Sequence, residues 1–138
     1  MDGSTMKKGF VANIEALTLK NGSYRKVLYT GTYSQLVLMS IKPGDEIGEE
    51  VHDDIDQFFR FEQGNGTVVI DGVKHRVRDG SGVIVPAGAL HNVINTSKET
   101  DLKLYTIYSP PEHQDGYVAR TKKVADATEE HFDGKTTE

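Results

Sequence analysis

Hydrophobic and polar positions alternate over short stretches along most of the chain, and each stretch ends near Gly, Pro, Asn or Asp. A period of two residues is typical of strands that bury one face, and the interrupting residues are typical of turns. The pattern therefore predicts an all-β protein. The predicted strands are Val11–Thr18, Tyr24–Tyr29, Ser34–Ile41, Glu49–His52, Gln57–Glu62, Thr67–Ile70, Val73–Val77, Gly82–Val85, His91–Asn95 and Leu102–Ile107.

The clearest turn lies at Asp71-Gly72, between two apolar runs. Both central residues of a type I′ turn need positive φ, which Asp and Gly adopt at little cost, so this segment predicts a two-residue hairpin. Pro43-Gly44 and Pro86-Ala87-Gly88 predict two further sharp corners, because proline fixes φ and glycine permits the left-handed region. Short strands and tight turns leave sandwiches, barrels and jelly rolls open as architectures.

The alternation ends after Ser109-Pro110-Pro111, and the remaining sequence is polar. A chain of 138 residues is long enough for one domain with an ordinary hydrophobic core. We expect an N-terminal extension over residues 1–9 that is disordered or derived from an expression vector, and a β-barrel over residues 10–110. We expect a polar C-terminal tail over residues 111–138, packed over the barrel or frayed. Within it, only Thr121–Phe132 could form a short helix.

Composition excludes several classes of partner and site. The 16 basic residues are scattered among 21 acidic ones, giving a formal net charge of −5, so we expect no nucleic acid partner. The absence of cysteine leaves His, carboxylate and amide groups as metal ligands and is consistent with a reducing compartment. No apolar run approaches the roughly 20 residues that span a bilayer, and the N-terminus lacks an apolar signal core. We therefore expect a cytoplasmic protein without a membrane partner.

Four polar residues could meet at one point of such a barrel. Glu50 and His52 are two positions apart in a predicted strand, so their side chains leave the same face. Gln57 follows the short connection 53–56, which could return the chain antiparallel to this strand. His91 begins a new strand after a sharp corner and could approach from across the barrel. The four side chains could ligate a metal ion and leave further coordination positions to water or a substrate.

The same residues recur at the spacing of two known signature motifs. The first motif, Gly-x5-His-x-His-x3–4-Glu-x6-Gly, is matched in spacing by Gly44, Glu50, His52, Gln57 and Gly64. The second, Gly-x5-Pro-x-Gly-x2-His-x3-Asn, is matched in spacing and residue type by Gly80, Pro86, Gly88, His91 and Asn95. Both are cupin motifs, and the chain resembles small single-domain cupins of the cupin 2 type, including those grouped with phosphomannose isomerases.

The resemblance implies a double-stranded β-helix, the conical jelly roll of RmlC-like cupins. It also implies one divalent ion, Mn, Fe, Ni, Co or Zn, held by Glu50, His52, Gln57 and His91. Two of these positions depart from the family pattern, because Glu50 replaces the usual first His and Gln57 replaces the usual Glu. The carboxylate has changed position, but either ligand set contributes a charge of −1. This retention of charge favours a metal site that is still used.

Two further expectations concern the ends of the chain. His113 and His131 lie in the polar tail, where we expect solvated side chains. Cupins commonly pair through sheet edges and exchanged N-terminal strands, so the resemblance implies a homodimer in which Phe10–Leu19 could be the exchanged strand.

Three functions remain open for such a barrel. The first is a metal-dependent enzyme acting on a small organic molecule through Lewis-acid or dioxygen chemistry, with Glu50 as a candidate base. A variant of it is a sugar or phosphosugar isomerase or epimerase, although the inward basic candidates Lys74, Arg76 and Arg60 are few and unclustered. The second is a non-enzymatic module that binds or senses a small ligand. The third is a jelly roll that has lost its metal and serves as a structural piece.

Overall fold

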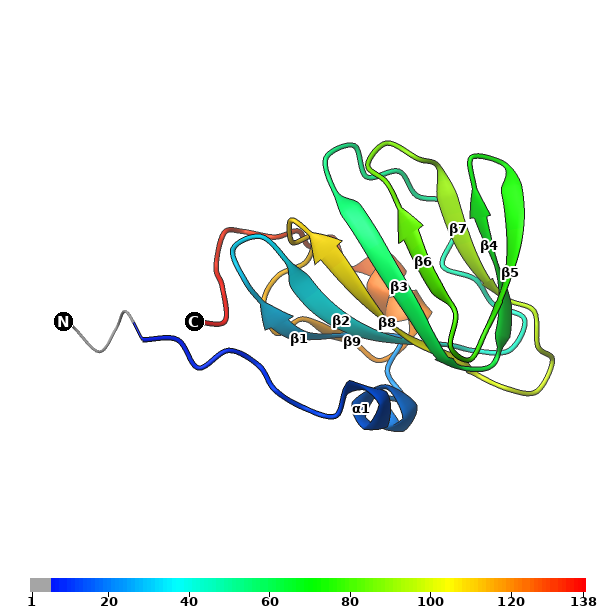
Figure 1. Cartoon of the computed structure of the whole chain (residues 1–138), viewed down its shortest axis with the longest axis horizontal. Coiled ribbons are helices and arrows are strands. Elements are labelled where there is room, and N and C mark those ends of the chain that lie inside the picture. The colour runs from blue at the N-terminus through cyan, green and yellow to red at the C-terminus, as the bar shows by residue number, and fades with distance from the viewer. Residues whose placement is uncertain (1–5) are drawn as a thin grey trace.

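The computed structural model describes residues 6–138, and the expectation for residues 1–5 of the N-terminal extension lies outside this range. The described chain folds into two antiparallel sheets that form a β-sandwich (Figure 1). One sheet has the order β6-β3-β8-β2-β1-β9 and the other the order β5-β4-β7. This mostly-β architecture confirms the predicted fold class. The elements are α1 (Ile14–Lys20), β1 (Arg25–Thr30), β2 (Gln35–Ile41), β3 (Asp56–Gln63), β4 (Asn65–Ile70), β5 (Val73–Arg78), β6 (Gly82–Val85), β7 (His91–Asn95), β8 (Leu102–Ser109), β9 (Val118–Ala119) and α2 (Lys122–Ala127).

Eight of the ten predicted strands are present, with ends within two residues of the prediction. The predicted hairpin is also confirmed, because Asp71 and Gly72 have φ values of 46° and 82° and join β4 to β5. The motif glycine Gly64, between β3 and β4, has φ of 97° and lies so close to the carbonyl of Asp101 that an added Cβ would stand 2.8 Å from it. Sharp turns at these positions set the register of the strands that follow.

The predicted strand Val11–Thr18 is wrong, because this segment contains helix α1. Asn13 caps the helix by accepting a hydrogen bond from the N–H of Ala16 at 3.0 Å. Ile14, Leu17 and Thr18 then lie on one face, at helical rather than strand spacing, and Thr18 is fully buried. The segment Phe10–Leu19, proposed as an exchanged strand, therefore contains a helix instead. The homodimer stays a prediction.

The interior of the sandwich changes from apolar to polar along the strands. The paired strands β3 and β8 point alternate residues inward, and the opposed inward pairs run from Phe61 with Leu104, through Phe59 with Thr106, to Gln57 with Tyr108. The apolar end is continuous with buried residues of the smaller sheet. Polar side chains at the other end cannot be buried without partners, and this is where the candidate site lies.

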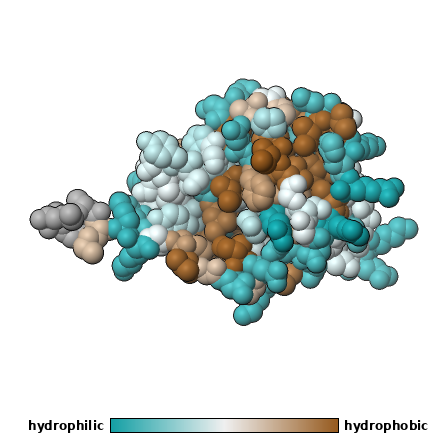
Figure 2. All heavy atoms as spheres, in the orientation of Figure 1, coloured by the Kyte–Doolittle hydropathy of each residue, from teal (hydrophilic) through white to brown (hydrophobic). Residues whose placement is uncertain are grey.

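The outer face of the larger sheet carries a row of apolar side chains. Strand register places Leu36, Ile107, Phe58 and Ile84 side by side across β2, β8, β3 and β6. Ile84 is 68% exposed. Figure 2 shows hydrophobic surface gathered over the face seen in Figure 1, with polar side chains around it. Within residues 6–138, no helix is long and apolar enough to cross a membrane.

The C-terminal region is part of the fold rather than a frayed end. Strand β9 pairs with β1 and extends the larger sheet by one strand, which the sequence analysis did not predict. Helix α2 falls within Thr121–Phe132, where a short helix was expected, and Thr121 caps it through the N–H of Val124. The residues that follow α2 return to the polar end of the sandwich and line a cavity there.

Candidate metal centre

Glu50 and His91 are held opposite each other by the backbone. The N–H of each donates to the carbonyl of the other, at 2.8 and 2.9 Å. The predicted strand Glu49–His52 is wrong, however, because this pair is an isolated bridge. A second bridge joins Glu46 to Ile94, and between the two the register slips by one residue, at Gly48 with φ of 105°. Directly opposed residues project from the same face, so the bridge brings the two side chains together.

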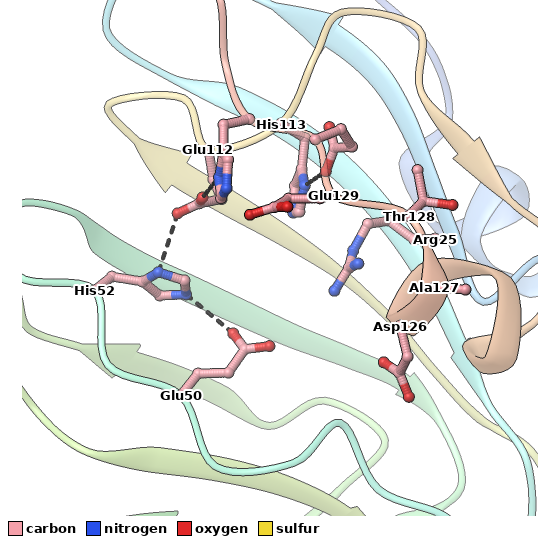
Figure 3. A pocket seen from close by; sticks show the side chains of 11 residues that line it. Arg25, Glu50, His52, Glu112, His113, Asp126, Ala127, Thr128 and Glu129 are labelled. Atoms are coloured by element: carbon pink, nitrogen blue, oxygen red, sulfur yellow. Dashed lines mark hydrogen bonds and ion pairs between the residues drawn. The ribbon is translucent and has the colours of Figure 1, made fainter.

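His52 completes a cluster with this pair. Its carbonyl accepts a hydrogen bond at 2.8 Å from the N–H of Gly88, which fastens it to the predicted corner before β7. One ligand atom each from Glu50, His52 and His91 lies within 4.8 Å of the others. Figure 3 shows Glu50 and His52 side by side, with Nε2 of His52 3.0 Å from Oε2 of Glu50. These three residues could hold a metal ion.

Both histidines present the same ring nitrogen to the centre. Nδ1 of His52 lies 3.0 Å from Oε2 of Glu112, and Nδ1 of His91 lies 3.0 Å from the carbonyl oxygen of Ala89. An Nδ1–H that donates to a fixed acceptor leaves Nε2 with its lone pair available, which is the usual arrangement behind metal-binding histidines. Glu112 lies in the polar tail, sixty positions beyond His52 and outside both motifs, so no local signal in the sequence marks it.

Gln57 is buried and only partly satisfied. Its Nε2 donates to Oγ1 of Thr106 at 3.0 Å, while its Oε1 has no hydrogen-bond partner among the described residues. In the strand register Gln57 faces Tyr108, whose ring centre is 6.0 Å from that of His52. Buried polar atoms normally have partners, so the lone Oε1 fits a ligand that the protein itself does not supply.

The charges of the cluster reinforce one another. Hydrogen bonds that His52 donates to the carboxylates of Glu112 and Glu50 raise its pKa to about 9, against the opposing effect of burial. Burial also opposes ionisation of Glu50, but the hydrogen bond and positive charge of His52 outweigh it and hold the pKa of Glu50 below its usual value. The pKa of Glu112 is lowered in the same way by His52. Without a metal, the three side chains therefore form an imidazolium between two carboxylates.

The cluster opens onto a cavity of about 550 Å³ whose far wall comes from the C-terminal region. His113, predicted to be solvated, is buried, because its Nδ1 lies 2.6 Å from Oε2 of Glu130 and its Nε2 lies 3.2 Å from the hydroxyl of Tyr108. His131 is exposed, as expected, with Nδ1 3.3 Å from Oε1 of Glu112. The wall is therefore built from acid–imidazole pairs.

Among residues 6–138, Arg25 is the one Arg or Lys that lines this cavity. Arg25 of β1 is 9% exposed and projects its guanidinium group into the space shown in Figure 3. The basic residues considered from sequence lie elsewhere, since Lys74 and Arg76 are exposed on β5 and Arg60 pairs with Glu62 at 2.9 Å. Arg25 is two residues before the buried Val27 in β1, so the two side chains leave the same face of the strand. This spacing is the sequence signal that predicts an inward side chain for Arg25.

Comparisons with known proteins show the family to which the chain belongs. Residues 37–108, more than half of its length, match the family model described as Cupin domain. The chain belongs to the cupin family. This cupin is similar to the uncharacterized protein YrkC of Bacillus subtilis, with 46% identity over 129 residues that cover 89% of the chain and 69% of YrkC.

Solved structures agree with this assignment. The crystal structure of BH2720 from Bacillus halodurans is 42% identical to this cupin, with a TM-score of 0.85, and the match covers 88% of the chain and 96% of that structure. An RmlC-like cupin from Shewanella frigidimarina is 22% identical, with a TM-score of 0.57 and coverage of 62% and 74%, and shows the likeness of fold alone. The names of these three proteins specify no reaction.

The residues of this cupin fit a divalent ion. Two imidazole nitrogens and one carboxylate oxygen form a mixed set suited to Mn, Fe, Co, Ni or Zn. Nε2 of His52 and Oε2 of Glu50 share a hydrogen bond at 3.0 Å, and an ion held by these two atoms would replace the shared proton. The departure at Glu50 still offers a carboxylate oxygen at the first motif position, and this oxygen could hold a metal ion together with His52 and His91.

Proposed function

We propose that this cupin is a metal-dependent enzyme that acts on a small organic molecule. The observation that carries the proposal is the convergence of Glu50, His52 and His91 beside an open cavity, with the Nδ1 atoms of both histidines already engaged by acceptors. The cavity volume lies within the range typical of small-molecule sites, about 300–1,000 Å³. A purely structural jelly roll would have no need to hold two imidazoles in this orientation.

The protein groups have separable roles in such an enzyme. Glu50, His52 and His91 would hold the ion, and Gln57 is proposed as a fourth ligand through its unpaired Oε1. Glu112 fixes the tautomer of His52, because its carboxylate accepts the Nδ1 proton. A bound ion of this kind acts as a Lewis acid toward carbonyl or hydroxyl oxygen, or activates water or dioxygen.

Glu50 is also our candidate for a general base. Its lowered pKa keeps the carboxylate ionised at neutral pH, as a proton acceptor must be. A carboxylate that both ligates an ion and accepts a proton must exchange between the two roles. Its position on the cavity wall leaves it within reach of a bound molecule.

Metal analysis by mass spectrometry tests the proposal. Tag-free protein expressed with Mn, Fe, Co, Ni or Zn should contain near-stoichiometric metal, and His52→Ala and His91→Ala should remove it. His75→Ala provides the matched control, since His75 is exposed on β5. Sub-stoichiometric metal that both site substitutions leave unchanged would contradict a metal centre.

Turnover separates the enzyme from a binding module. Metal-loaded protein should consume dioxygen or isomerise a small carbonyl or hydroxyl compound in a substrate screen, and His52→Ala should abolish the activity. Tight binding of a screened compound without any conversion would favour the sensor function instead.

A further inference from the structure

Arg25 is a buried cation that the protein itself does not neutralise by direct contact. Its Nε is buried without a hydrogen-bond partner, and its guanidinium group forms no ion pair with a carboxylate of residues 6–138. The guanidinium group lies 5.2 Å from the ring centre of Tyr24, which restricts its position on one side. A buried charge without a hydrogen-bonded partner is costly, so its retention requires an explanation.

The neighbouring acids are committed elsewhere or exposed. Glu50 and Glu112 bond to His52, and Glu130 bonds to His113 and to the N–H of Gln114. The other two acids of the cavity, Asp126 and Glu129, are solvent-exposed at its rim, where water and salt screen their charge. Arg25 is therefore a buried donor on the cavity wall that forms no hydrogen bond through Nε and no ion pair with residues 6–138.

We propose that Arg25 binds the carboxylate group of a small organic acid and so positions this acid beside the cluster of Glu50, His52 and His91. A carboxylate site at Arg25 does not itself require a metal. Only the position of the acid beside the cluster rests on the proposed function. The planar guanidinium fork matches a carboxylate through two parallel hydrogen bonds.

The surrounding charge favours a carboxylate over a phosphate. A carboxylate brings one negative charge into a cavity already lined by five acidic side chains, whereas a phosphate brings up to two. Phosphate sites usually gather several donors or cations, and in the described chain Arg25 is the one Arg or Lys that lines this cavity. The substrate class is thus a small monocarboxylate.

Calorimetric titration with defined probes tests the assignment. Acetate, glycolate, malonate and inorganic phosphate are titrated into wild type, Arg25→Gln, Arg25→Lys and the exposed control Arg76→Gln, each in metal-free and metal-loaded form. Glycolamide serves as the neutral counterpart of glycolate. Circular dichroism and metal content establish that each variant is folded and equally loaded.

At least one carboxylate should bind wild type with a millimolar or lower Kd, and Arg25→Gln should weaken this binding by at least about tenfold. Arg25→Lys should give an intermediate loss, while Arg76→Gln and the metal content stay unchanged. Should Arg25→Gln fail to fold, the loss in Arg25→Lys decides in its place.

Three results would overturn the assignment. The first is that wild type binds no carboxylate at 10 mM probe, about the threshold for a single weak charge-assisted contact. The second is that wild type and the Arg25 variants bind the carboxylates equally. The third is that phosphate is the only probe whose binding depends on Arg25. Failure to load metal would contradict the proposed function but leave the metal-free titrations as a full test of Arg25.

Discussion

The cavity of this cupin has two walls that are held in place by different means. On the barrel wall, backbone hydrogen bonds between Glu50 and His91 and between Gly88 and His52 fix the candidate ligands. On the C-terminal wall, Glu112, His113 and Glu130 are held largely through side-chain pairs. Backbone pairing is insensitive to side-chain identity, whereas an acid–imidazole pair is lost when either partner changes. The positions of the candidate ligands are therefore robust to substitution of neighbouring side chains, while the environment of the ligands depends on individual residues.

Replacing one carboxylate on each wall should give the largest contrast. Glu50→Ala removes a candidate ligand and should abolish stoichiometric metal binding, whereas Glu130→Ala on the opposite wall should leave metal content unchanged. Both variants lose one ionised carboxylate, so net charge is matched. Metal analysis after dialysis distinguishes them, and equal losses in the two variants would contradict the division of the cavity into a ligand wall and a supporting wall.

Glu112 links the two walls, and Glu112→Gln should weaken metal affinity without abolishing it. The amide is a poorer acceptor for the Nδ1–H of His52, and loss of such a partner typically costs about 10–100-fold in affinity. Competition with a chromophoric chelator measures this change. The exposed Glu129→Gln, from the same wall, should stay within about twofold of wild type if the effect comes from contact with His52 rather than from net charge.

The raised pKa of His52 predicts a pH dependence with a defined sign. Because the folded pKa is about 9 and an unfolded His titrates near 6.5, this group stabilises the metal-free protein fully below pH 6.5. The contribution is lost as pH rises through about 9. Thermal unfolding of metal-free wild type should therefore show a falling Tm across this window, and Glu112→Gln should flatten the profile.

Metal binding must displace the same proton. Metal affinity should rise with pH up to about 9, and binding at pH 7 should release about one proton per ion. Calorimetry in buffers of different ionisation enthalpy counts that proton. Proton uptake, or none released, would show that His52 is not the group that the ion displaces.

His113→Ala should reduce stability while leaving metal content intact. The substitution leaves Glu130 without its imidazole partner and the hydroxyl of Tyr108 without a hydrogen bond, at a cost of about 1–3 kcal/mol. Chemical denaturation measures the loss. His131→Ala is the matched control, because its side chain is 72% exposed, and we expect a change within about 0.5 kcal/mol.

Gln57→Leu should give the smallest effect on metal. The substitution removes the proposed amide ligand and the hydrogen bond to Thr106, and replaces them with apolar volume. We expect a loss of metal affinity below about tenfold, since a neutral amide is a weaker ligand than imidazole or carboxylate. A loss as complete as that of His91→Ala would make Gln57 a principal ligand rather than an auxiliary one.

Local sequence accounts for much of the fold. Alternation identified the strands with one buried face, and Asp71-Gly72 identified a hairpin, because both signals act over neighbouring residues. The errors arose where another local preference competed. The segment after Asn13 reads equally well at strand or helix spacing, and the cap decides for the helix. The bridge at Glu50 depends on a register slip that no alternation pattern records.

The sequence by itself determined the all-β fold class through its alternation, and its resemblance to the cupin motifs implied the grouping of Glu50, His52 and His91. Only the tertiary structure decided which groups surround them. Arg25 and Glu112 come from opposite ends of the chain, and nothing in their local sequence relates one to the other. They line one cavity because the segment between β8 and β9 lies along its wall and β9 then pairs with β1 at Arg25. Contacts between segments that are far apart in the sequence depend on how the strands pair and the two sheets pack, and this packing is a property of the whole fold.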